Sequence, residues 1–181
     1  MRKTLSVIVV CACCLIGQVV DAQIVKLPKV LGFANVTYAN PSNADFKNVS
    51  NHGLGYEIGA GIGLGKTLLM GSVGRMSYNI PNALVVNGTT VSTSDHLKVT
   101  PLKIGLRQYL IAGLFLNGNV GVAMQKYDKY SATASNFLWE AGAGFKFGFL
   151  ELAAAYTGYK MAGTSINANS LLLKGGIAIK L

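Results

Sequence analysis

Cysteine and histidine are scarce in this chain, and their scarcity removes several kinds of chemistry. The three cysteines, Cys11, Cys13 and Cys14, all lie near the N-terminus, and the only histidines are His52 and His96. Thiolates and imidazoles supply most zinc ligands and most nucleophile–base pairs. We therefore expect no zinc site, no disulfide-stabilised core and no thiol catalysis.

The first residues predict a secretory signal peptide. The basic pair Arg2-Lys3 precedes an apolar run from Leu5 to Ile16. A cleavage site of the small-residue type follows at Val20 to Ala22. We expect residues 1–22 to be removed. The remaining residues, 23–181, are long enough for one domain and contain no cysteine.

Acidic residues are also few, at 7 Asp and Glu against 16 Lys and Arg, which gives a formal net charge of +9. A basic chain suits either nucleic acid or an anionic membrane surface. The basic residues are not clustered among aromatic ones, and an exported chain does not meet nucleic acid, so we exclude it as a partner. Anionic lipid headgroups are the expected counterpart.

Past the leader, the sequence lacks an apolar run long enough for a spanning helix, although its mean hydropathy of +0.41 is high. The best candidate, Gln108 to Gln125, is interrupted by Asn117 and Asn119. A spanning helix needs about 20 predominantly apolar residues, whereas a spanning strand needs about 9–11. Segments of this strand length recur along the chain.

Apolar residues alternate with small or charged ones from Leu54 to Leu64 and again from Leu68 to Tyr78. A period of two indicates a strand, and the intervening Gly65-Lys66-Thr67 indicates a hairpin turn. The sequence predicts eight strands in all: Lys29–Ala39, Leu54–Leu64, Leu68–Tyr78, Leu97–Tyr109, Leu114–Gln125, Phe137–Phe147, Leu150–Tyr159 and Leu171–Leu181.

The connections between these strands alternate in length. Long ones (40–53, 79–95, 126–135 and 160–169) alternate with short ones (65–67, 110–113 and 148–149). Long loops at one end, with short turns and both termini at the other, are the pattern of transmembrane barrels. Closure also removes the sheet edges that hydrocarbon does not tolerate. We predict an all-β, eight-stranded antiparallel up-and-down transmembrane β-barrel.

The two ends of this barrel carry further expectations. We interpret residues 40–53 as a polar loop and Asn87-Gly88 as the turn of a hairpin extension. Aromatic residues are expected outside the barrel in two belts. Those near the long loops are Tyr38, Tyr56, Tyr78, Phe137 and Trp139, and those near the short turns are Phe145 and Phe147.

Charged residues on the small-residue faces of the strands are expected to point into the lumen. They are Glu57, Arg75, Lys103, Arg107, Glu140, Lys146, Glu151 and Lys174. A three-residue turn at 65–67 places Glu57 opposite Arg75, and a two-residue turn at 148–149 places Lys146 opposite Glu151. These charges form either a salt-bridged structural plug or a functional site, which would be a gated polar path or a ligand site. We favour the plug, because eight strands enclose an interior that side chains just fill.

Two motifs suggest chemistry that their context does not support. Residues 60–67 (AGIGLGKT) approximate a phosphate-binding loop, but a strand pattern follows Thr67 where such a loop needs a helix, so we exclude nucleotide. His52 lies near Ser50 and Asp45, and His96 near Ser94 and Asp95, which are the residue types of a lipid A-modifying triad. We interpret both histidines as solvated loop residues and expect no catalytic residue, metal or cofactor.

Several segments resemble the outer-membrane protein β-barrel domain family of Bacteroidota: GYEIGAGIGLG, TPLKIGLRQYL with LFLNGNVGVAM, and FLWEAGAGFKFG with FLELAAAYTGY. The resemblance covers residues 23–181. It implies an eight-stranded monomer in the outer membrane of a Gram-negative bacterium, with the barrel-insertion machinery as a partner during biogenesis. Such barrels usually end in an aromatic residue, whereas this chain ends in Leu181.

The resemblance implies no assigned activity, so three hypotheses follow. The first is a structural or interaction barrel whose loops contact lipopolysaccharide, envelope proteins or other surfaces. The second is a narrow conduit or a secretion-system assembly factor, and the third a lipid A-modifying enzyme. Lysines near the long loops either grip lipopolysaccharide phosphates or form a solvated surface: Lys47, Lys98, Lys126, Lys129 and Lys160.

Overall fold

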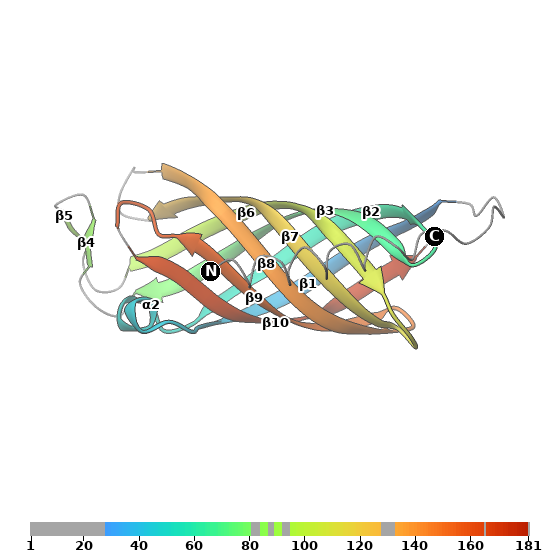
Figure 1. The fold of residues 1–181 in the computed structure, drawn as a ribbon. Coiled ribbons are helices and arrows are strands. Elements are labelled where there is room, and N and C mark those ends of the chain that lie inside the picture. The colour runs from blue at the N-terminus through green and yellow to red at the C-terminus, as the bar shows by residue number, and fades with distance from the viewer. Residues whose placement is uncertain are drawn as a thin grey trace, which may run out of the picture.

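A computed structural model describes residues 28–80, 84–86, 89–91, 95–127, 133–164 and 166–180, and these form a closed antiparallel barrel of eight strands (Figure 1). The strands are β1 (Lys29–Pro41), β2 (Gly53–Leu64), β3 (Thr67–Ile80), β6 (Asp95–Tyr109), β7 (Leu114–Tyr127), β8 (Thr133–Phe147), β9 (Leu150–Lys160) and β10 (Asn167–Lys180). Sequence neighbours pair throughout, and β1 closes the barrel on β10. The predicted fold class is confirmed. The expected signal peptide, the three cysteines and Leu181 lie outside the described residues.

The two ends of the barrel differ, as the lengths of the connections predict. Figure 1 shows the short helix α2 (Ala44–Val49) and strands β4 (Leu84–Val86) and β5 (Thr89–Val91) at one end, and the C-terminus at the other. Strands β4 and β5 pair antiparallel, which confirms the predicted hairpin, although Asn87 and Gly88 are outside the described residues. We call the first end the loop end and the second the turn end.

The outer wall of the barrel is apolar. Along β2 the exposed residues are Leu54, Tyr56, Ile58, Ala60, Ile62 and Leu64, while Glu57 and the glycines face inward. The same alternation runs along β6, β7, β8, β9 and β10. A wall of large exposed aliphatic and aromatic side chains is unfavourable in water and is covered by hydrocarbon in a bilayer.

Strand β3 runs in a different register from the one the sequence analysis predicts. Leu64 pairs with Thr67, so the turn has two residues, with Gly65 at φ 64°. Leu68, Met70, Met76 and Tyr78 therefore point inward and Arg75 points outward. A shift of one residue moves every side chain to the other face. The predicted inward Arg75 and outward Tyr78 are wrong for this reason, and Glu57 lies opposite Gly74 instead.

The predicted polar loop at 40–53 contains α2, which is only six residues long. Asp45 lies in its first turn and Lys47 in its last, an arrangement that suits the helix dipole. Phe46 is fully buried and anchors the helix to the barrel. No helix in the described part of the chain is long and apolar enough to span a membrane.

Candidate functional site

Four charged residues meet at mid-height inside the barrel. They come from four different strands: Glu57 (β2), Lys103 (β6), Glu140 (β8) and Lys174 (β10). Lys103 Nζ lies 2.9 Å from Glu57 Oε1 and 2.7 Å from Glu140 Oε2. Lys174 Nζ lies 2.8 Å from Glu57 Oε2 and 2.7 Å from Glu140 Oε1. Each lysine thus bridges both carboxylates, and we call this group the ion layer.

The ion layer is buried and electrically balanced. All four side chains are shielded from solvent, and Asn119 Nδ2 donates a further hydrogen bond of 3.0 Å to Glu140 Oε1. Buried charges are tolerated when they are paired and when their remaining hydrogen-bonding capacity is used. Two carboxylates and two ammonium groups satisfy both conditions. The layer therefore crosses the lumen without net charge.

A second ion pair lies nearer the turn end. Arg107 binds Glu151 through two bonds, with Nη1 at 2.6 Å from Oε2 and Nη2 at 3.0 Å from Oε1. The guanidinium carbon lies 4.1 Å from the ring centre of Phe115 and 5.5 Å from that of Phe33. A bidentate pair stacked against aromatic rings is well suited to a confined interior.

Lys146 is at the inner mouth of the turn end. It is the register partner of Glu151, as the sequence analysis expects, but the Glu151 carboxylate binds Arg107. The Lys146 ammonium donates to the carbonyl of Gly148. Of the eight predicted lumen charges, the structure thus places six deep inside, Lys146 at the mouth and Arg75 on the outer wall.

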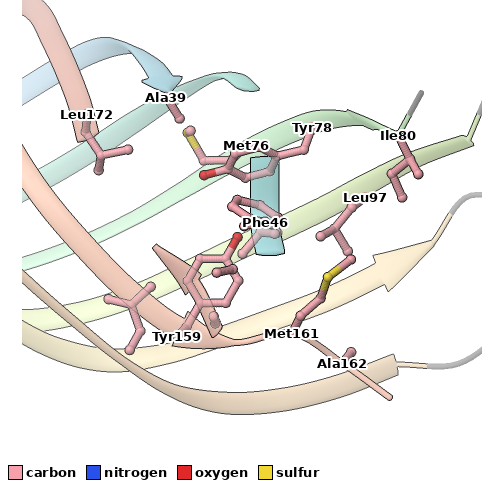
Figure 2. Packing of buried hydrophobic residues seen from close by; sticks show 14 of the residues in the cluster. Ala39, Phe46, Met76, Tyr78, Ile80, Leu97, Tyr159, Met161, Ala162 and Leu172 are labelled. Carbon is pink, nitrogen blue, oxygen red and sulfur yellow. The ribbon is translucent and has the colours of Figure 1, made fainter. Parts of the chain in front are cut away.

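Apolar side chains fill the lumen at the loop end. Figure 2 shows Phe46 reaching from α2 into a group that includes Tyr78, Leu97 and Tyr159. The rings of Phe46 and Tyr78 meet edge to face with centroids 5.3 Å apart. We call this group the loop-end cluster; it consists of Ala39, Phe46, Met76, Tyr78, Ile80, Leu97, Val99, Ala123, Tyr127, Leu138, Ala155, Tyr159, Met161, Ala162, Ala168 and Leu172.

The connection between β9 and β10 is held over this cluster by a buried amide. Gln125 Nε2 donates to the Lys160 carbonyl at 2.8 Å, and Gln125 Oε1 accepts from the Ala162 N–H at 2.9 Å. Tyr127 Oη donates to the Ala162 carbonyl at 3.3 Å. The sequence analysis missed the cluster. Its available signal was Phe46, an apolar residue inside an otherwise polar loop.

Little space is left around the ion layer. A cavity toward the loop end has a volume of about 30 Å³, and one toward the turn end about 20 Å³. Each is the size of about one water molecule. A smaller apolar group, Leu31, Leu68, Met70 and Ala178, packs at the turn end.

The outer wall at the loop end is basic. Arg75, Lys98, Lys126 and Lys160 point outward there, and Lys47 is exposed on α2. Tyr38, Tyr56, Phe137, Trp139 and Tyr156 are exposed on the same wall. Lys129 lies outside the described residues. Exposed aromatic residues at both ends agree with the predicted belts, with the exception of Tyr78.

The two histidines lie at the loop-end rim. The His52 ring stacks on Tyr38 with centroids 6.0 Å apart, and His96 is on the outer wall opposite Asn79. Ser50 near His52 has a buried hydroxyl, while Ser94 and the side chain of Asp95 are outside the described residues. No group of three or more metal-binding side chains occurs among the described residues.

The phosphate-loop-like segment is part of a β-hairpin. Residues 60–64 belong to β2, Gly65 and Lys66 form the turn, and Thr67 begins β3. The backbone N–H groups of such a strand are used in sheet pairing, whereas a phosphate-binding loop needs them free at a helix N-terminus. The expected strand after Thr67 is confirmed.

No family model and no curated protein matches the sequence. Solved structures do match the fold. The attachment invasion locus protein Ail of Yersinia pestis, in complex with the heparin analogue sucrose octasulfate, is similar with a TM-score of 0.54 at 12% identity, covering 84% of this chain and 97% of that one. Ail in a phospholipid bilayer nanodisc gives a TM-score of 0.53 at 15% identity, over 82% and 99%.

The N-terminal β-barrel domain of OprF from Pseudomonas aeruginosa is similar with a TM-score of 0.50 at 15% identity, covering 85% of this chain and 98% of that one. These are small outer-membrane barrels. The chain shares their fold, and its apolar outer wall is the surface that a bilayer covers. It has the fold of an integral outer-membrane β-barrel.

Proposed function

We propose that this protein is a closed interaction barrel, which conducts nothing through its lumen and acts through its loop end. The observation that carries the proposal is the ion layer, in which each of two carboxylates contacts both of two ammonium groups at 2.7–2.9 Å. A permeating ion would have to separate these pairs. Breaking a buried pair costs about 3–5 kcal/mol, which is a high barrier at a single position.

The residues on either side of the ion layer support the same proposal. An ion crossing from the loop end would first have to displace Phe46 and the side chains around it. It would then meet the Arg107–Glu151 pair and the apolar group containing Leu31 and Met70. Apolar packing at both ends, with ion pairs between them, favours a structural filling over a gated polar path.

The loop end is the part of the molecule that we propose makes contacts. Outward cations near the rim, including Arg75 and Lys126, lie where the phosphates of lipopolysaccharide are found in an outer leaflet. Exposed Tyr38 and Tyr56 lie on the same wall, at a depth typical of a membrane interface. We propose lipopolysaccharide as a contact, with envelope or surface proteins bound by the loops, and no catalytic step.

We also propose that the chain belongs to the Bacteroidota-type group of small outer-membrane barrels, because of the segments quoted above. It is proposed to act as a monomer and to enter the membrane through the barrel-insertion machinery. The insertion proposal predicts that depletion of that machinery leaves the protein in its unfolded, slowly migrating gel form.

Conductance in planar bilayers tests the closed lumen. The refolded protein, shown to be folded by its heat-modifiable gel migration, is expected to give no current steps above the lipid background. Frequent steps in the wild-type protein that change size in Glu57→Gln would instead identify a conduit. The matched control is Asp45→Asn, which removes a carboxylate of the exposed α2 and should leave the traces unchanged.

A separate assay addresses catalysis. Lipid A from cells that express the protein should have the same mass spectrum as lipid A from cells that lack it. A new lipid A species that disappears in His52→Ala or His96→Ala would contradict the proposal and support an enzyme.

A further inference from the structure

The pairing that neutralises the ion layer leaves one hydrogen-bond donor of each lysine to be placed. An ammonium group carries three N–H donors and no acceptor. Lys174 Nζ directs two of them to Glu57 Oε2, at 2.8 Å, and to Glu140 Oε1, at 2.7 Å. Lys103 Nζ likewise contacts one oxygen of each carboxylate, at 2.9 and 2.7 Å. The ion pairs therefore account for two of the three donors on each side chain.

Two small cavities flank the ion layer, and each is lined by one of these lysines. Lys174 lines the cavity of about 20 Å³ toward the turn end, and Lys103 lines the cavity of about 30 Å³ toward the loop end. Both lysine side chains are buried, so bulk solvent does not receive their third donors. Because a buried donor without an acceptor is costly, we expect an acceptor for it inside each cavity.

The turn-end cavity is also lined by two amide oxygens that need a donor. Asn35 Oδ1 and Asn117 Oδ1 are buried and accept no hydrogen bond from any group in the described part of the chain. Asn35 donates through Nδ2 to Glu151 Oε1 at 3.4 Å, and Asn117 is the register partner of Arg107. The cavity therefore lies between the ion layer and the Arg107–Glu151 pair. It offers a bound molecule one donor, from Lys174, and two acceptors.

The loop-end cavity offers a similar set of groups. Thr37 Oγ1 lines it, is buried, and has no hydrogen-bond partner among the residues that the structure describes. Thr37 is the register partner of Lys174, which places its side chain beside the ion layer. A hydroxyl group both donates and accepts. Together with the third donor of Lys103, it can hold a molecule that accepts one hydrogen bond and exchanges another.

The electrostatics of the lumen favour a neutral molecule in both cavities. The ion layer and the Arg107–Glu151 pair each contain equal numbers of positive and negative groups. An added ion would therefore be a buried charge without a counter-charge, which is strongly unfavourable. The volumes match about one water molecule each, and a buried water typically makes about three hydrogen bonds.

We propose that one water molecule is bound on each side of the ion layer. In the turn-end cavity it accepts from Lys174 and donates to Asn35 and Asn117. In the loop-end cavity it accepts from Lys103 and bonds to the hydroxyl of Thr37. These two waters use the donors that the ion pairs leave over, and the turn-end water joins the ion layer to the Arg107–Glu151 pair in one hydrogen-bonded network.

A crystal structure of the folded mature protein, at a resolution that shows ordered water, tests both positions. We expect one peak of water density in each cavity, about 2.7–3.2 Å from the lysine Nζ. The same distance should separate the turn-end peak from Asn35 Oδ1 and Asn117 Oδ1, and the loop-end peak from Thr37 Oγ1. A rubidium soak should add no anomalous peak in either cavity. Such a peak would identify a bound cation and overturn the assignment.

Two variants, each the control for the other, test the hydrogen-bonding partners in nanodiscs. NMR measures the transfer of magnetisation from water to the side-chain amide of Asn35, which in the wild type should have the sign of a water that tumbles with the protein. Asn117→Leu replaces an acceptor with methyl groups that occupy the turn-end cavity, so this transfer should disappear. Thr37→Val removes the loop-end hydroxyl with little change of shape, so the transfer should be unchanged. In crystals of Thr37→Val the loop-end peak alone should be lost.

Two outcomes would overturn the water sites. If wild-type crystals show ordered water at the loop-end rim and none in the two cavities, the assignment is wrong. If the transfer to Asn35 persists in Asn117→Leu that migrates as a folded barrel, the turn-end site is wrong. Should Asn117→Leu not fold, the wild-type crystal and Thr37→Val decide the question. None of these results changes the contacts proposed for the loop end, which are tested separately.

Discussion

The ion layer and the loop-end cluster fill the same lumen by different means. The ion layer takes one residue from each of four strands, and each charge depends on two others. The loop-end cluster is apolar and includes Phe46, which belongs to a short helix between β1 and β2 rather than to the barrel sheet. The comparison shows that ion pairs between four strands hold the middle of the barrel together. At the loop end, by contrast, α2 packs onto the apolar cluster through the buried side chain of Phe46.

The largest effect on stability is expected in the ion layer, where each charged side chain contacts two of opposite sign. Replacing Glu140 with Ala leaves Lys103 and Lys174 sharing one carboxylate in a buried site, so the free energy of unfolding should fall by about 3–5 kcal/mol. Urea titration in lipid vesicles, followed by gel migration, measures the change. The control Asp45→Ala removes an exposed carboxylate, and equal losses in the two variants would contradict the proposed dependence.

The next effect should be local. Replacing Phe46 with Ala removes the side chain that attaches α2 to the loop-end cluster, a burial that contributes about 1.5–3 kcal/mol. Because the helix lies outside the sheet, residues 42–52 should become sensitive to protease while the barrel keeps its unfolding midpoint. Replacing Phe137 with Ala, on the outer wall, is the matched aromatic control. A lowered midpoint in Phe46→Ala would show that the two regions are not independent.

A smaller effect is expected inside the loop-end cluster. Tyr78 Oη lies 3.5 Å from Ser170 Oγ, at the long end of the hydrogen-bond range, and its ring packs on Phe46. Tyr78→Phe keeps the ring and removes the hydroxyl, so the free energy of unfolding should change by about 1 kcal/mol or less. Tyr78→Ala, which removes the ring, should change it by several times more. Similar changes in both variants would assign the stabilisation to the hydroxyl.

The smallest effect on stability is expected for Arg75. Its side chain is on the outer wall, and exposed substitutions typically change stability by less than about 0.5 kcal/mol. Arg75→Gln should therefore unfold with the wild-type midpoint in vesicles that lack lipid A. If Arg75→Gln lowered the free energy of unfolding as much as Glu140→Ala does, Arg75 would have to point into the lumen. That result would support the register with a three-residue turn that the sequence alone suggests.

The sequence determined the faces of most strands but could not determine which charges meet. In β2 only one set of alternate residues is apolar, and the prediction was correct. In β3 both sets are apolar, since Leu68 and Met70 alternate with Leu69 and Val73. Its orientation then depended on whether the turn had two residues or three, a distinction that local propensity resolves poorly.

Partner assignment failed for a related reason. Neighbouring strands can be paired from turn lengths, but Glu57 on β2 contacts Lys103 on β6 and Lys174 on β10, and neither of these strands neighbours β2. Contacts across a lumen depend on the curvature of the closed sheet, and alternation carries no information about curvature. The burial of Phe46 was missed because the loop that carries it is otherwise polar, although this lone aromatic residue was an available signal.

The arrangement of the ion layer makes its formation part of barrel closure. Lys174 is on the final strand, and its partner Glu57 precedes it by 117 positions on the second strand. Until β10 meets β1, Glu57 cannot hold both of its lysines. Joining the seam therefore also completes the pairing of Glu57, which until then lacks one of its two ammonium partners. The pairing of β10 with β1 thus completes the barrel wall and the ion layer in the same step.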